Sequence, residues 1–155
     1  MTGVQTCALP ILSKSLETLT VRIDRHCENA LVIAEKLEAS QEINWVKYPF
    51  LKSHPQYALA KKQMLKVGNI VAFEVKCGLE AGRNFINAIR LCSLSSNLGD
   101  SRSIITHPAS TTHSKLSKED RLAVGITDGM IRLSVGLEHH EDIWNDLKNA
   151  LSNLG

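Results

Sequence analysis

Apolar residues recur every three or four positions near the start of the chain. They stand at Leu16, Leu19, Ile23, Cys27, Ala30, Ala34 and Leu37. Because residues three and four apart share one face of a helix, this spacing predicts a single amphipathic helix from Ser13 to Ala39. A helix of about 27 residues is longer than most globular helices, which favours a role as a bridge between two layers or two domains.

The rest of the chain alternates predicted strands with predicted helices. Val71, Phe73 and Val75 alternate with their neighbours, as in a half-buried strand. Other predicted strands cover residues 43–48, 92–96, 103–106 and 130–135, and other predicted helices cover 57–65, 79–91 and 138–151. We expect Gly68 to close the helix that begins at Tyr57. This order predicts one α/β domain over residues 12–155, in which helices cover a sheet.

One segment has neither the spacing of a helix nor the alternation of a strand. Residues 107–114, HPASTTHS, are rich in Pro, Ser and Thr and predict a loop. Ser117 follows, with Asp120 three positions later, which is a weakened form of the capping box that opens helices. We therefore expect a short helix that begins there and ends near Gly125.

Composition narrows the class of protein. The chain has 155 residues, a formal net charge of +2, 43% hydrophobic and 22% charged residues. These values are typical of a globular protein and argue against disordered, collagen-like and disulfide-scaffold classes. Acidic and basic residues are interleaved, so charge favours neither nucleic acid nor an anionic membrane as a partner. No apolar run approaches the roughly 20 residues of a membrane-spanning helix.

The cysteines and the first residues bear on where the protein works. Cys7, Cys27, Cys77 and Cys92 are widely spaced and form no C-x-x-C pair, which favours a reducing, cytoplasmic location. Residues 1–11, MTGVQTCALPI, lack the basic start of a secretory signal and contain Pro10. We interpret them as a non-native or disordered leader, with a native floppy terminus as the alternative.

Arg132 is the first candidate for chemistry, because it lies within the apolar strand segment IRLSVG. A guanidinium cannot lose its charge, so its position is costly unless it is paired. One interpretation is a solvent-facing arginine on the polar side of the strand, which it shares with Ser134. The other is a planar fork that binds a carboxylate through two parallel hydrogen bonds. Asn97, in the turn NLGD, is either a turn residue or a second donor beside Arg132.

Other polar residues have simpler explanations. Thr111 and Thr112 can cap the loop backbone. His107 and His113 lie six positions apart, but no cysteine or carboxylate cluster completes a ligand set, so we predict no metal site. A basic patch at Lys61, Lys62 and Lys66 is typical of a solvated helix face.

Five segments resemble one known family. They are RHCENAL from Arg25, VKYPFLKSHPQYALAKKQM from Val46, FEVKCGLEAGRNFI from Phe73, NLGDSRSIITHPASTTHS from Asn97 and IRLSVGLEHHEDI from Ile131. In this order they resemble the carboxy-terminal domain of the Cys/Met-metabolism family of pyridoxal-phosphate enzymes, over residues 12 to about 151. The resemblance implies the small domain of a fold-type I enzyme, a mainly antiparallel sheet covered by helices and preceded by a long helix.

The resemblance also implies an activity. Asn97 before LGD and the double threonine of HPASTTH are most similar to the O-acetylhomoserine sulfhydrylase branch, whereas methionine γ-lyases and cystathionine γ-synthases more often have Ser and Met there. The implied reaction replaces the acetate of O-acetylhomoserine by sulfide or a thiol in homocysteine or methionine synthesis. By the same resemblance, Arg132 holds the substrate α-carboxylate, Asn97 donates a second hydrogen bond to it, and Thr112 shapes the pocket.

Part of the family pattern has no counterpart here. The lysine that forms an imine with pyridoxal phosphate, and the rest of the cofactor cradle, belong to a larger upstream domain in the family. Neither Lys115 nor Lys118 lies in a matching motif, so we assign no catalytic residue and expect the chain to be an inactive fragment of an enzyme that is a homotetramer when complete. Phe50 and Cys77 stand where the family commonly has glycine, and each would be strained if its position requires a positive φ. A non-catalytic interaction domain is the alternative from another class.

Overall fold

A computed structural model of the chain describes residues 3–154, with side chains from residue 9 onward. The helices are α1 (Gly3–Glu17), α2 (Leu19–Glu38), α3 (Tyr57–Gln63), α4 (Gly78–Ala88), α5 (Lys118–Ala123) and α6 (His140–Leu151). The strands are β1 (Ile43–Lys47), β2 (Ile70–Val75), β3 (Ser93–Leu94), β4 (Ile104–Thr106) and β5 (Met130–Ser134). Apart from the split of the first helix and a 3-10 turn over Pro108–Ser110, the predicted order of elements is confirmed.

The five strands form one sheet in the order β1-β2-β5-β4-β3. Every neighbouring pair is antiparallel except β3 with β4, which confirms the predicted mainly antiparallel sheet. Strand β5 lies in the centre, where Arg132 is paired with Ala72 on one side and with Thr106 on the other. The strand that carries the arginine is therefore held by hydrogen bonds along both edges.

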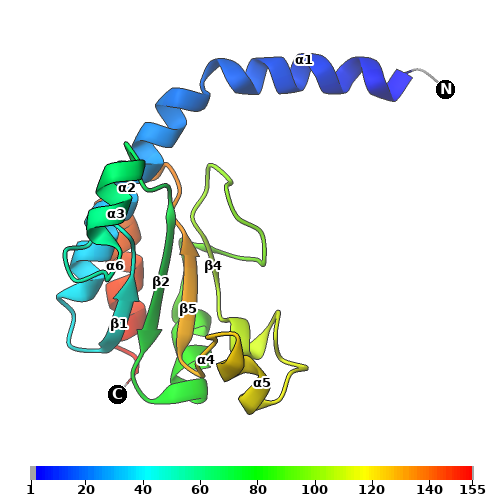
Figure 1. Cartoon of the computed structure of the whole chain (residues 1–155). Coiled ribbons are helices and arrows are strands. Elements are labelled where there is room, and N and C mark those ends of the chain that lie inside the picture. The colour runs from blue at the N-terminus through cyan, green and yellow to red at the C-terminus, as the bar shows by residue number, and fades with distance from the viewer. Residues whose placement is uncertain (1–2, 155) are drawn as a thin grey trace.

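Helices cover one face of this sheet (Figure 1). The core joins α2, α4 and α6 to the alternate, inward-facing residues of the central strands. Its fully buried members include Ile33, Leu37, Val71, Phe73, Val75, Phe85, Ile131, Leu133, Ile143 and Leu147. Because successive strand residues point to opposite faces, burial of Ile131 and Leu133 in this core directs Arg132 to the face away from the helices.

The first helix is not continuous, contrary to the prediction. It is interrupted at Thr18, and α1 projects away from the rest of the molecule (Figure 1). The apolar stripe is accordingly divided: Leu16 and Leu19 are 55% and 41% exposed, whereas Ala34 and Leu37 are fully buried against the sheet. Residues 3–11 of the expected leader form part of α1, and residues 1–2 lie outside the described residues. That the leader is non-native stays a prediction.

Two predicted helices also end earlier than expected. Helix α3 ends at Gln63, because Met64 is already extended, so Gly68 does not close it. Leu65, which the periodicity assigned to this helix, is fully exposed. Helix α4 ends at Ala88 rather than near Leu91. Its continuation is prevented because the carboxylate of Asp146 accepts the backbone N–H groups of residues 90, 91 and 92 at 2.8–3.1 Å.

Two polar side chains fasten α2 to the end of β5. The buried His26 lies with Nδ1 at 2.6 Å from the carbonyl oxygen of Val135. Three residues later on the same helix face, the Asn29 amide donates to the carbonyl oxygens of Gly136 and Glu138 at 3.0 and 2.8 Å. These bonds satisfy backbone groups just beyond the strand, where no ladder partner remains. They fix the path of the chain that follows Arg132.

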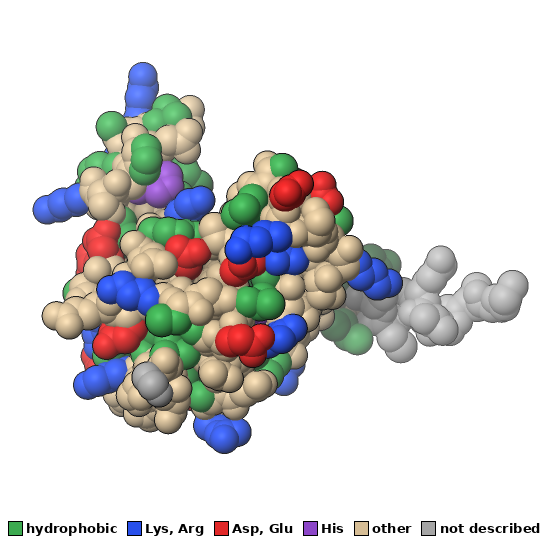
Figure 2. Space-filling view, turned by 90° about the horizontal axis from the view of Figure 1, so that it is seen from below, with side chains coloured by type: hydrophobic (Ala, Val, Ile, Leu, Met, Phe, Trp, Pro, Cys, Tyr) green, Lys and Arg blue, Asp and Glu red, His purple; other side chains and the backbone are tan. Residues whose placement is uncertain are grey.

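Surface features agree with an ordinary globular chain. No helix among the described residues is long and apolar enough to cross a bilayer. On the face shown in Figure 2, basic and acidic side chains are interspersed.

Backbone geometry separates the two positions where the family commonly has glycine. Cys77 has φ 71° and ψ 16°, in the left-handed region, and is the only non-glycine residue of positive φ in the described structure. Phe50 does not share this conformation. The expected strain is therefore present at Cys77 alone. Cys77, Cys27 and Cys92 are free thiols, whereas the side chain of Cys7 lies outside the described residues.

We expect Cys77→Gly to stabilise the protein. A non-glycine residue in the left-handed region destabilises the folded state by about 1–2 kcal/mol, and glycine removes this strain. Glycine also stabilises the unfolded chain by about 0.4–1 kcal/mol, because it has more conformational freedom there, and this offsets part of the gain. Urea unfolding should therefore give a free energy of unfolding about 0.5–1 kcal/mol higher. Cys77→Ala is the matched control, because it removes the exposed thiol but keeps a Cβ and leaves stability nearly unchanged. A lower stability of the glycine variant would contradict the strain.

Candidate functional site

Arg132 is half-buried on the sheet face that the helices leave open. Its guanidinium Nη2 donates to two successive backbone carbonyls, that of Ser96 at 2.6 Å and that of Asn97 at 3.0 Å. Its Nε is buried and has no hydrogen-bond partner in the described structure. The side chain therefore does not extend freely into solvent, and one of its N–H groups remains without compensation. A buried N–H without a partner is costly, so we expect a polar group, from water or from a ligand, to satisfy it.

Asn97 reaches Arg132 through its backbone, not through its side chain. Its carbonyl oxygen accepts from Nη2 of Arg132, and its N–H donates to Ser95 Oγ at 3.2 Å. Both Ser96 and Asn97 are exposed, at the start of the loop of residues 95–103 that joins β3 to β4. The structure therefore brings Asn97 and Arg132 together, as the resemblance implied, but by a main-chain contact that sequence analysis did not foresee.

Thr112 lies apart from this contact. It is exposed, and its Oγ1 is 2.8 Å from Nδ1 of the adjacent His113. Thr111 instead faces the sheet, with its Oγ1 3.0 Å from Oγ1 of Thr106, the residue paired with Arg132. Thr111, for which the sequence predicted only capping of the loop backbone, is thus connected to the strand neighbour of the arginine, and its Oγ1 also makes the expected capping bond to the His107 carbonyl at 2.8 Å.

A cavity of about 460 Å³ opens beside the 95–103 loop. Its polar lining includes Ser95, Ser96, Thr106, Ser110 and Thr111, with Arg83 and Asn87 on α4. Ile86, Leu94 and Ile105 form its apolar part. It shares Ser96 and Thr106 with the surroundings of Arg132. The sequence did not predict that these serine and threonine residues line a cavity. The only indication was the high content of Ser and Thr in this part of the chain.

His107 supports one wall of this cavity and is fully buried. Its Nε2 is 2.7 Å from the carbonyl oxygen of Asp128, so Nε2 carries the hydrogen, and Nδ1 lies 2.8 Å from the Ser110 hydroxyl. Burial lowers the pKa of His107 from 6.5. Gly82 packs directly on the ring, where any side chain would collide with it. Since both ring nitrogens are used, the geometry assigns His107 a structural role. The described residues contain no group of three or more potential metal ligands.

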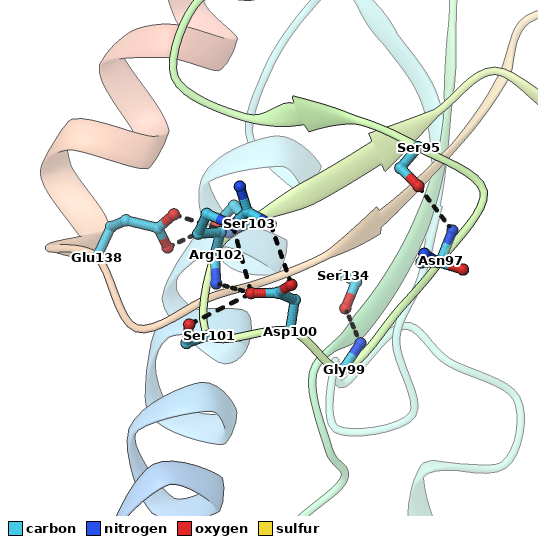
Figure 3. A network of polar contacts seen from close by, with 9 residues as sticks. All are labelled: Ser95, Asn97, Gly99, Asp100, Ser101, Arg102, Ser103, Ser134 and Glu138. Carbon is cyan, nitrogen blue, oxygen red and sulfur yellow. Dashed lines mark hydrogen bonds and ion pairs between the residues drawn. The ribbon is translucent and has the colours of Figure 1, made fainter. Parts of the chain in front are cut away.

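The 95–103 loop is tied to the end of β5 by a chain of hydrogen bonds (Figure 3). The N–H of Gly99 donates to Oγ of Ser134 at 3.0 Å. Glu138 accepts from the N–H and the hydroxyl of Ser103 at 2.7 and 3.0 Å. The Ser103 hydroxyl in turn accepts from the N–H of Gly136 at 2.9 Å. A side chain on Gly136 would collide with the backbone of the loop, so only glycine permits this close approach.

The exposed tip of this loop has its own local charge pair. The Asp100 carboxylate accepts from the N–H and the guanidinium of Arg102, which lowers the pKa of Asp100 to about 2. Arg102 therefore has a carboxylate partner within the loop, whereas Arg132 is bound only by carbonyl oxygens. Arg132 thus has no carboxylate partner among the described residues and could donate to one without breaking an ion pair.

The lysines considered for an imine do not approach the cavity. Lys118 forms an ion pair with Asp128 at 2.8 Å, and Lys115 is exposed. In the part of the chain that the structure describes, the cavity lining contains no lysine. The residues that line the cavity therefore do not fit the covalent attachment of a pyridoxal group.

A family model described as Cys/Met metabolism PLP-dependent enzyme matches residues 2–152. Among curated relatives, the L-methionine gamma-lyase of Porphyromonas gingivalis is 49% identical over 144 residues, which are 93% of this chain and 36% of the relative. The O-succinylhomoserine sulfhydrylase of Mycobacterium tuberculosis is 43% identical over 92% of this chain and 36% of the relative. The chain thus spans about a third of the length of these relatives.

Solved structures are similar to this chain over a comparable portion of their length. A Campylobacter jejuni structure, named for an O-acetylhomoserine (thiol)-lyase with N′-pyridoxyl-lysine-5′-monophosphate, superposes with a TM-score of 0.83 and 43% identity. The match covers 90% of this chain and 33% of that one. Cystathionine gamma synthase from Xanthomonas oryzae, in complex with aminoacrylate and cysteine, gives a TM-score of 0.84 and 42% identity over 91% of this chain and 36% of that one.

The lowered pKa of His107 makes stability pH-dependent in a defined window. In the unfolded chain this histidine binds a proton near pH 6.5, whereas the folded protein resists it, so the free energy of unfolding should fall as the pH drops below about 6.5. The slope is at most about 1.4 kcal/mol per pH unit. Urea unfolding between about pH 7.5 and 5 measures it, above the range where carboxylates such as Asp128 titrate.

His107→Gln is the control for this dependence. The glutamine amide can still donate toward the Asp128 carbonyl but does not titrate. We expect it to lower stability at neutral pH and to flatten the pH profile. An unchanged slope in this variant would assign the dependence to other groups.

Proposed function

The chain belongs to the Cys/Met-metabolism family of enzymes that depend on pyridoxal phosphate, and we propose that it supplies the site that binds the substrate α-carboxylate. The group that carries this role is the guanidinium of Arg132. The observation that supports the proposal is the buried, unpartnered Nε beside an Nη2 already engaged by two carbonyls. An arriving carboxylate would satisfy the free N–H and neutralise the charge.

The other proposed residues act around this contact. The carbonyl oxygens of Ser96 and Asn97 orient the guanidinium, and the Asn97 side chain at the loop start is proposed to donate a second hydrogen bond to the carboxylate. Thr112 is proposed to shape the pocket from the loop of residues 107–114. A carboxylate held by both Arg132 and Asn97 keeps the amino acid in one orientation, which reduces the entropy lost at each reacting step.

The bond-breaking chemistry is not assigned to this chain. In enzymes of this kind the cofactor acts as the electron sink, and the protein binds and orients the substrate. The described residues around the cavity include no lysine to which the cofactor could be covalently attached. We propose that the chain is the carboxy-terminal part of an enzyme whose cofactor is held by the portion of the relatives that this chain does not match, in a homotetramer.

For the reaction, we propose an O-acetylhomoserine sulfhydrylase that uses sulfide or a thiol. The support is Asn97 in NLGD and the Thr111–Thr112 pair in HPASTTH, together with the structural similarity to the C. jejuni protein. A methionine γ-lyase is the second candidate, favoured by the 49% identity to the P. gingivalis enzyme. The two reactions differ in the group that leaves the substrate, acetate in one and methanethiol in the other.

Carboxylate binding by the chain itself tests the central proposal. Titration with L-norvaline, followed by NMR of the Arg132 Nε–H, should shift this signal, because a charge-assisted hydrogen bond forms there. The methyl ester of norvaline, which lacks the carboxylate, should not shift it. Measured by calorimetry, because this variant has no Nε–H signal, Arg132→Ala should weaken binding at least about tenfold, since hydrogen bonds to charged groups are worth about 1.5–3 kcal/mol.

Arg102→Ala is the matched control for this titration. It removes a guanidinium from the same loop region, but one that already has the Asp100 partner. We expect its affinity for norvaline to equal that of the parent chain. Equal weakening by both substitutions would mean that general charge, not a site at Arg132, attracts the ligand.

A chimera tests the choice of reaction. Residues 12–151 replace the matching portion of the P. gingivalis L-methionine gamma-lyase, and release of acetate from O-acetylhomoserine is compared with release of methanethiol from methionine. We expect the ratio of the two kcat/KM values to move toward O-acetylhomoserine by about tenfold relative to the parent lyase. A ratio that stays at the parent value would favour the γ-lyase assignment.

A further inference from the structure

Arg132 depends on a loop whose position is set elsewhere in the molecule. The carbonyls that hold its Nη2 belong to Ser96 and Asn97, at the start of the 95–103 loop. Both residues are exposed, so packing does not immobilise them. Whatever fixes this loop also fixes the guanidinium, and through it the direction of the unpartnered Nε.

Ser134 is one of the fixed points of this loop, beside the N–H of Ser95, which donates to the Ile105 carbonyl at 3.3 Å, and the carbonyl of Ser101, which accepts from the Leu137 N–H at 2.8 Å. Ser134 lies two positions after Arg132 on β5, on the same face of the sheet, and is fully buried. Its Oγ accepts the N–H of Gly99 from the loop at 3.0 Å and the side-chain amide of Asn69 at 3.1 Å. Asn69 also donates to the carbonyl oxygen of Val135 at 3.0 Å. The Asn69 amide therefore holds the Ser134 hydroxyl in a fixed orientation.

The loop backbone is shaped for this contact. Gly99 has φ 78°, a left-handed conformation that turns its N–H toward the sheet, and no atom lies within 4 Å of the place where its Cβ would be. The positive φ, rather than a shortage of space, therefore explains glycine at this position. Strand β5 thus binds the 95–103 loop at two places. Arg132 donates to two loop carbonyls, and Ser134 accepts one loop N–H (Figure 3 shows the Ser134 contact).

We propose that Ser134 is a positioning residue for substrate carboxylate binding, because it anchors the 95–103 loop so that the Ser96 and Asn97 carbonyls hold the guanidinium of Arg132 in place. This deepens and rests on the proposed function of Arg132. Ser134 itself touches no substrate. It acts through Gly99 and the loop, so its loss releases the guanidinium without removing any group from the site.

Ser103 offers a matched control. It is also a fully buried serine, and its Oγ also accepts one backbone N–H, that of Gly136. Its bonds, however, tie the far end of the loop to Glu138 rather than to the Arg132 end. A merely structural role would make Ser134→Ala and Ser103→Ala equivalent in every measurement. The proposal predicts instead that only Ser134→Ala changes the mobility of the Arg132 guanidinium.

The first measurement needs no ligand. In the full chain, NMR of the Arg132 guanidinium reports rotation about its terminal bonds, which hydrogen bonds to carbonyls slow. We expect Ser134→Ala to accelerate this rotation at least about fivefold, as loss of a net hydrogen bond of about 1 kcal/mol implies. Ser103→Ala should leave it within about twofold. Slow rotation that persists in a folded Ser134→Ala variant would overturn the proposal.

The second measurement is norvaline affinity. Ser134→Ala should weaken it about fivefold, and Ser134→Thr, which keeps the hydroxyl, should restore it. If the parent chain shows no Arg132-dependent binding, the proposed function fails, while the rotation measurement still decides the positioning role. If Ser134→Ala does not fold, Ser134→Cys, with a weak sulfur acceptor in nearly the same volume, should change rotation in the same direction. An unchanged rotation there counts against the proposal.

Discussion

A charged guanidinium in the central strand of a sheet has to be compensated, and this requirement organises the open face of the molecule. Arg132 cannot shed its proton, and its neighbours Ile131 and Leu133 are fully buried in the core. The compensation comes from backbone carbonyl dipoles of the 95–103 loop. Carbonyl oxygens supply partial charge but not a full counter-charge. The positive charge of Arg132 is therefore only partly balanced within the described residues, and our proposal of a substrate carboxylate at this position rests on that imbalance.

The segment after the arginine explains why the loop can serve in this way. His26 and Asn29 on α2 bind the chain at residues 135–138, and Glu138 in turn binds Ser103 at the end of the loop. The helical layer and the loop, on opposite sides of the sheet, are therefore joined through one short polar stretch. Gly136 allows the approach, because any side chain there would meet the loop backbone. An apolar core alone would not define the loop position, since hydrophobic contacts lack direction.

In the helical layer, burial and helix ends also depend on residues that are distant in the sequence. The stripe from Cys27 to Leu37 is buried because the sheet lies beneath it, while the same periodicity across Leu16 and Leu19 meets no partner among the described residues. Helix α4 ends at Ala88, and the Asp146 carboxylate accepts the amides of residues 90, 91 and 92 just beyond it. Asp146 lies more than fifty positions away in the chain, so no local pattern around Ala88 could have placed this boundary.

The sequence by itself determined most of the elements, their order, the inward residues of β2, and the family, because hydrophobic periodicity and short motifs are local properties. It also singled out Arg132, since an arginine inside an apolar strand is unusual wherever the strand lies. Only the tertiary structure decided that Asn97 meets it through a carbonyl, that Thr111 rather than Thr112 faces the sheet, and that Ser134 holds Gly99. The contacts of Arg132 with Asn97 and of Ser134 with Gly99 join side chains to loop backbone across 35 positions. Their direction depends on where β5 and the loop are placed by the rest of the fold, which no local pattern encodes.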